Sequence, residues 1–124
     1  MSLNFNNMER RYIDVPAPYF GDSVVIRVNR LAVKHYVKSV QLSRQFDERK
    51  DISESDKLAY IIAASLIAVC TLPDSGQFAF DDSQIDDLVN KLPPDLFEAL
   101  SAANHQLNQV KTDSDTLSQK KSES

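Results

Sequence analysis

The sequence contains very little of the material from which disulfides, phosphate-binding loops and metal sites are built. It has one cysteine, two histidines and two glycines, and it has no tryptophan. One cysteine cannot form an internal disulfide, which is consistent with a reducing compartment. Two glycines leave little for a phosphate-binding loop, and the sequence has no P-loop, GxGxxG, GxSxG, HExxH or CxxC motif. These absences argue against an enzyme, and they predict no cofactor, no metal site and no catalytic residue.

The few residues that could carry chemistry stand apart from one another. Cys70 lies near the C-terminal end of the most apolar predicted helix, an environment that does not activate a thiol. It is therefore predicted to be a buried structural cysteine. His35 and His105 are far apart in the sequence, and neither has a ligand or triad signature beside it. Neither histidine therefore indicates a metal site or an activated nucleophile.

The sequence also lacks a long apolar run and a leader segment. The longest apolar run, residues 58–72, is interrupted by Ser65 and Thr71 and is shorter than the ~20 residues that cross a bilayer. The first residues, MSLNFNNMERRY, do not have the basic-then-apolar layout of a signal peptide. The net charge of −4 argues against a general polyanion binder. A cytosolic protein with no membrane partner is expected.

The hydrophobic pattern predicts an α+β fold that is mostly α. Residues 12–28 hold two short runs rich in β-branched and aromatic residues, separated by Pro16, Pro18 and Gly21, which is typical of a β-hairpin. Apolar residues at helical spacing then predict about four helices. The expected helices span residues 29–46, 54–71, 82–92 and 94–107.

These elements are expected to form a single domain over residues 12–108. Residues 1–11 are polar and predict a flexible N-terminus. Residues 109–124 have only two aliphatic side chains, too few to offset the entropy of ordering a chain segment. A disordered C-terminal tail is therefore predicted.

Capping signals mark two of the helix starts. Ser53 is a candidate N-cap for the helix that begins at residue 54. Asp81 with Gln84 three residues later has the arrangement of a capping box. Phe80 and Ile85 occupy the positions of a hydrophobic staple around the same start. These signals predict that the stretch after the central helix is a turn that leads directly into another helix.

Charge is distributed unevenly along the chain. Residues 27–50 carry seven Lys or Arg against two acids, and residues 74–98 carry seven acids against one Lys. The favoured interpretation is that these are solvated faces of neighbouring helices that attract each other. Two alternatives remain open. In the first, the basic helix contacts an acidic partner. In the second, the chain is a small helical regulatory or nucleic-acid-associated protein that uses the basic 27–50 segment. The absence of a recognition-helix signature and the acidic second half argue against nucleic acid.

Taken in order, the segments resemble the tail assembly chaperones of long-tailed phages and prophages. The resemblance spans roughly residues 12–108 and is specific as an ordered set of elements. It departs from the family pattern in VPAPYFG, which has two prolines and lacks a tryptophan near the turn. The segments that carry it are Val15-Pro16 with Gly21, Asp74-Ser75-Gly76, Phe80-Asp81-Asp82 and Leu107-Asn108.

The resemblance implies a non-enzymatic chaperone in the cytoplasm of the bacterial host. It implies that the chain binds the tape-measure protein, keeps it soluble during tail assembly and is absent from the mature virion. In this family a longer product made by frameshifting often recruits the major tail tube protein, and such a form is left open here. Self-association is left open too.

A helical domain can hold an amphipathic helix in an apolar groove, and two apolar stripes are candidates for its rim. The same helical spacing also describes ordinary core packing, so spacing does not decide which stripe stays exposed. The first stripe comprises Val33, Tyr36, Val37 and Val40, and the second comprises Leu96, Phe97 and Leu100.

Overall fold

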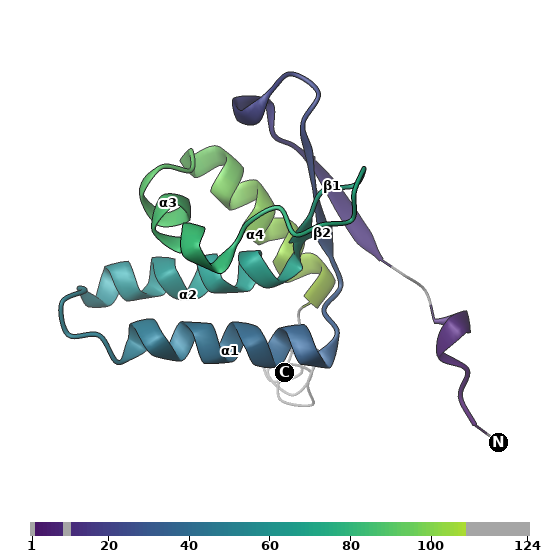
Figure 1. The fold of residues 1–124 in the computed structure, drawn as a ribbon, viewed down its shortest axis with the longest axis horizontal. Coiled ribbons are helices and arrows are strands. Elements are labelled where there is room, and N and C mark those ends of the chain that lie inside the picture. Colours follow the sequence, from purple (N-terminus) through teal and green to yellow (C-terminus); the bar gives the residue numbers. More distant parts are fainter. Residues whose placement is uncertain (1, 9–10, 109–124) are drawn as a thin grey trace, which may run out of the picture.

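A computed structural model describes residues 2–8 and 11–108 of the 124-residue chain. The predicted fold class is confirmed: a β-hairpin at the N-terminal end precedes four α-helices (Figure 1). The predicted C-terminal tail, residues 109–124, lies outside the described residues. The elements are β1 (Tyr12–Pro16), β2 (Val25–Asn29), α1 (Val33–Asp47), α2 (Glu54–Val69), β3 (Cys70–Thr71), α3 (Ile85–Asn90) and α4 (Pro94–Asn108).

The β1–β2 hairpin supplies one edge strand, β1, and the central strand, β2, of the sheet. The two strands pair antiparallel from Tyr12 opposite Asn29 to Pro16 opposite Val25. β1 is the edge strand and Pro16 is its last residue, a place where a missing backbone N–H is tolerated. At the tip of the hairpin, the Tyr19 hydroxyl donates to the Asp95 carboxylate at 2.6 Å, which joins the loop to the first turn of α4.

The sheet has a third strand that the sequence did not reveal. α2 ends at Val69, and the next two residues pair antiparallel with β2 instead of continuing the helix to residue 71. The chain then turns at Gly76, whose φ of 72° lies in the left-handed region that favours glycine. It returns along β3, where the Ala79 amide donates to the Cys70 carbonyl at 3.0 Å.

The helix starts follow the capping signals in the sequence. The Asp56 amide donates to the Ser53 hydroxyl at 3.2 Å, which caps α2. Asp81 and Gln84 form the predicted capping box, which opens a 3-10 turn that leads into α3. α1 begins at Val33, later than the expected residue 29, because Asn29 is the last residue of β2.

α2 is the central helix of the fold. It packs against α1, α3, α4 and β2, and it lies between α1 and α3 (Figure 1). Seven of its side chains are buried, whereas α1 buries only Ser39 and Phe46. α1 is therefore an outer helix that packs mainly on α2. None of the helices in the described ranges has both the length and the apolar character needed to span a membrane.

Candidate partner-binding groove

The structure places the two predicted apolar stripes in different surroundings. On α1, Val33, Tyr36 and Val37 are 79%, 56% and 45% exposed, and Val40 is half-buried. On α4, Leu96 and Leu100 are buried in the core and Phe97 is half-buried against it. The α1 stripe is therefore an open surface, whereas the α4 stripe mainly holds the fold together.

An open groove of about 840 Å³ lies beside the α1 stripe. It is bounded by the segment that enters α1, by the middle of α2 and by the C-terminal half of α4. Its volume is within the range of about 300–1,000 Å³ that is usual for ligand pockets. Its main apolar lining residues are Leu31, Val33, Tyr36, Ile62 and Leu107.

Asparagine side chains fix the back wall of the groove. Asn108 accepts from the Leu31 amide at 2.7 Å and donates to the Asn29 carbonyl at 3.0 Å and to Asn104 Oδ1 at 2.9 Å. Asn104 in turn donates to the Ser65 hydroxyl at 3.2 Å. This chain of contacts joins α4 to α2 and to the entry of α1, so the three walls are held in one arrangement.

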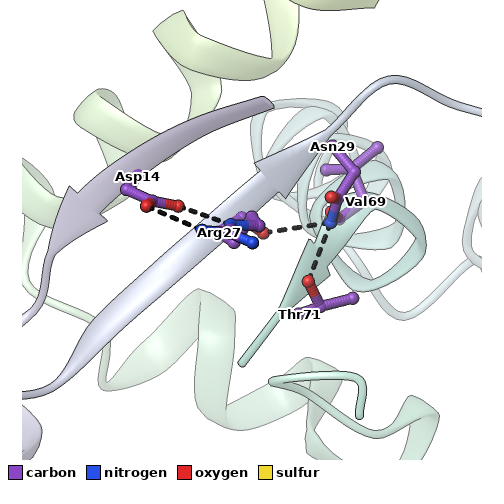
Figure 2. A network of polar contacts seen from close by, with 5 residues as sticks. All are labelled: Asp14, Arg27, Asn29, Val69 and Thr71. Atoms are coloured by element: carbon purple, nitrogen blue, oxygen red, sulfur yellow. Dashed lines mark hydrogen bonds and ion pairs between the residues drawn. The ribbon is translucent and has the colours of Figure 1, made fainter. Parts of the chain in front are cut away.

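Asn29 extends the same network into the sheet (Figure 2). Its side-chain amide donates to the Val69 carbonyl at 2.9 Å and to the Thr71 hydroxyl at 2.8 Å. One residue thus links β2 to the junction of α2 and β3, while its carbonyl supports Asn108. Sequence analysis did not single out Asn29, Asn104 or Ser65 for this role. In the structure, Asn104 directly follows the buried Ala103, and this position next to the core is what brings its side chain into the network.

Two cationic side chains lie at the entry of α1. Arg30 lines the groove, and Lys34 lies beside the lining residue Val33 in the first turn of α1. Within residues 2–8 and 11–108, neither Arg30 nor Lys34 makes an ion pair. No Asp or Glu is among the residues that line the groove.

Three other cations of the basic segment are paired within the chain. Arg27 binds Asp14 at 2.8 Å across the hairpin, and this hydrogen bond holds the pKa of Asp14 below its usual value. Arg49 binds Asp51 at 2.7 Å in the connector after α1. Lys38 of α1 lies 3.4 Å from Asp82 at the start of the acidic helix, which agrees with the predicted attraction between neighbouring helices.

The chemistry available elsewhere is limited. Cys70 is buried, as predicted, and burial raises the pKa of its thiol to about 12. In the part of the chain that the structure describes, no three His, Cys, Asp or Glu side chains are grouped to hold a metal ion. His35 packs edge-on against Phe78, and His105 lines the groove.

Comparison with known proteins supports the predicted resemblance through structure. No family model matches the chain, and no curated protein matches it. The solved structure of the bacteriophage HK97 tail assembly chaperone is similar, with a TM-score of 0.53 and 16% sequence identity. The similarity covers 80% of this chain and 87% of the HK97 chain. The resemblance to tail assembly chaperones is therefore confirmed at the level of the fold.

Proposed function

We propose that this chain is a non-enzymatic tail assembly chaperone that binds the tape-measure protein and keeps it soluble during tail assembly. The fold shared with the HK97 chaperone supports this assignment. The observation that carries the binding role is the open groove beside Val33 and Tyr36, whose walls are already joined by hydrogen bonds. The proposed place of action is the cytoplasm of the bacterial host, before the mature virion forms.

The proposed function rests on covering the exposed apolar surface of the partner helix. A long amphipathic helix that exposes its apolar face aggregates unless another surface covers it. Burial of one large apolar side chain contributes roughly 1.5–3 kcal/mol relative to its exposure to water. Val33 and Tyr36 are mostly exposed in the free chain, so a partner helix would gain this contribution from both.

The test is co-expression of the full chain with the tape-measure protein, followed by measurement of soluble recovery and co-purification. The wild-type chain should bring the partner into the soluble fraction. The double variant Val33→Asp/Tyr36→Asp should lose most of this effect, because the charges are placed in the groove. Leu58→Asp serves as the control, since Leu58 is 60% exposed on α2 but does not line the groove.

Two results would contradict the proposal. The first is a partner that stays insoluble with the wild-type chain although both proteins are well expressed. The second is an equal loss with the Leu58→Asp control, which would show that the groove has no special role. A frameshift-extended form that recruits the tail tube protein, and self-association of the chain, remain separate predictions.

A further inference from the structure

We propose that the partner helix in the groove is acidic: it carries Asp or Glu side chains beside its apolar ridge, placed to pair with Arg30 and Lys34. This inference rests on the proposed function only in that the groove holds a helix. It adds the charge of the partner, which the fold comparison does not address. The argument begins with the charges that face the groove from each of its walls.

Arg30 is the one Lys, Arg, Asp or Glu side chain among the residues that line the groove. The wall from α1 and its entry contributes Arg30. Lys34 is not itself a lining residue, but it follows the lining residue Val33 in the first turn of α1. The wall from α2 is uncharged, with Ile62 and Ser65. The α4 wall contributes His105, and Glu98 of the same helix is not among the lining residues. A partner would therefore meet positive charge without a compensating carboxylate.

The start of α1 reinforces this positive end. The helix has no acidic residue in its first turn, and its N-cap, Ala32, offers no side-chain hydrogen bond. The positive pole of the helix dipole is therefore not offset locally. Arg30 precedes the helix and Lys34 lies in its first turn, so both add positive charge at this end of α1.

Segments of this chain do not match these charges. Residues 2–8 expose Leu3, Phe5 and Met8 but include no acid. Residues 109–124 have three Lys against three acids and only two aliphatic side chains. The acidic helix α3 already buries its apolar residues Ile85 and Leu88 in the core, so a second copy cannot present them. None of these three segments complements the groove, which favours a helix from a different protein as the occupant.

The probe is a pair of synthetic helical peptides of about 20 residues, long enough to form a helix with help from a binding surface. Both carry the same leucine ridge, and the flanking positions are Glu in one peptide and Lys in the other. Fluorescence anisotropy measures their binding to the full-length chain at about 0.15 M salt, where distant charges are screened. The acidic peptide should bind roughly tenfold more tightly, because each of two exposed ion pairs contributes about two- to fivefold.

Charge reversal at the groove gives the decisive comparison. Arg30→Glu/Lys34→Glu should reverse the preference, so that the basic peptide binds more tightly. Arg44→Glu/Lys50→Glu produces the same change in net charge away from the groove and should leave the preference intact. Val33→Asp/Tyr36→Asp should weaken the acidic peptide most, because it removes apolar surface and adds negative charge.

Several outcomes would overturn the inference. Equal binding of the two peptides would show that the rim does not select charge. Unchanged binding to Val33→Asp/Tyr36→Asp would place the peptides elsewhere. If Val110→Asp/Leu117→Asp in the full chain raised the affinity for both peptides equally, the chain's own C-terminal segment would be the occupant. Binding of a DNA duplex through Arg30 and Lys34 at the same salt would identify nucleic acid as the partner.

The two proposals can fail separately. A charge preference that follows Arg30 and Lys34, together with a tape-measure protein that stays insoluble, would leave the groove inference standing and remove the chaperone assignment. Successful co-purification that depends on Val33 and Tyr36, together with equal binding of the two peptides, would do the opposite.

Discussion

At the scale of single residues, Asn108 links more parts of the groove than any of its apolar lining residues does alone. Its side chain makes hydrogen bonds to the Leu31 amide, the Asn29 carbonyl and Asn104 Oδ1. These partners belong to the entry of α1, to β2 and to α4 itself. A side chain of another shape would leave partly buried polar groups without partners, which is more costly than the loss of a surface contact.

We predict that Asn108→Ala lowers the free energy of unfolding by about 1–3 kcal/mol, because it removes three hydrogen bonds and leaves their partners unpaired. Urea denaturation followed by circular dichroism measures the change. Asn90→Ala is the control: Asn90 is exposed and donates to the Asp86 carbonyl, so its loss should cost less than about 0.5 kcal/mol. Equal effects of the two substitutions would contradict the role assigned to Asn108.

Cys70 provides a probe of core integrity. Its thiol has a pKa of about 12 in the fold, against the ordinary value of 9.0, because burial disfavours the thiolate. We predict that iodoacetamide at pH 8 modifies the native chain at least about a hundredfold more slowly than the urea-unfolded chain, since the thiolate is the nucleophile. Mass spectrometry of timed samples measures both rates, and similar rates would show that the α2–β3 junction opens readily.

The raised pKa of the Cys70 thiol also makes the stability of the fold depend on pH. The folded thiol holds its proton more tightly than the unfolded thiol, so the contribution of Cys70 to stability is complete below pH 9.0. It is lost progressively as the pH rises from there toward about 12, because the unfolded chain ionises first. Cys70→Ala should remove this part of the alkaline slope.

At the scale of elements, α1 and α2 differ in how firmly the fold holds them. α2 is enclosed by three other helices and by β2, whereas α1 packs mainly on α2 and leaves one long face in water. Local opening requires less free energy in elements with few buried contacts. The helix that carries the exposed stripe is therefore the helix that can adjust most easily to a partner.

We predict that the amides of α1 exchange with solvent hydrogen before those of α2 under native conditions. Hydrogen exchange followed by mass spectrometry tests this directly on the full chain. Binding of the acidic peptide should slow exchange in the first turns of α1, around Val33 and Tyr36, more than in α2. Equal protection of the two helices in the free chain would contradict the prediction.

The sequence was most informative where a signal is local. Ser53, Asp81 and Gln84 act within one turn of the chain, and their caps appear in the structure as predicted. β3 was missed because two residues form a strand only when β2 supplies the partner, and β2 lies more than forty residues earlier. Local pattern carries no information about such a pairing.

The groove was predictable only in part for a related reason. Helical spacing defined the α1 and α4 stripes equally well, but spacing does not say which neighbour covers a face. The fold covers Leu96 and Leu100 and leaves Val33 and Tyr36 exposed. The asparagine network joins residues from separate elements, so it exists only once the whole domain has assembled.

At the scale of the whole molecule, the basic and acidic parts of the chain largely compensate each other. The net charge is −4, and Arg27, Lys38 and Arg49 each have an acidic partner within the described residues. Of the cations in residues 27–50 without an ion pair in the described residues, Arg30 and Lys34 lie at the groove, and Arg44 and Lys50 lie away from it. A duplex, which needs several phosphate contacts, finds few of them here.

We predict no measurable binding to a DNA duplex of about 20 base pairs at 0.15 M salt, because counterion release from two or three cations is too small to hold it. Fluorescence anisotropy over a salt series measures this. Weak binding that disappears as salt rises is compatible with the remaining cations. Binding that persists at 0.15 M salt and falls with Arg30→Glu/Lys34→Glu would support the nucleic-acid alternative instead.

The chain continues from Asn108, a residue of the groove wall. Anything joined to the C-terminal end, whether a longer translation product or an engineered fusion, is linked to the edge of the groove through residues 109–124. A tethered domain meets the groove at an effective concentration set by its linker, about millimolar for short flexible linkers. If such a domain also binds the occupant of the groove, the link between the two sites raises the overall affinity. No conformational change in the fold is needed for this gain.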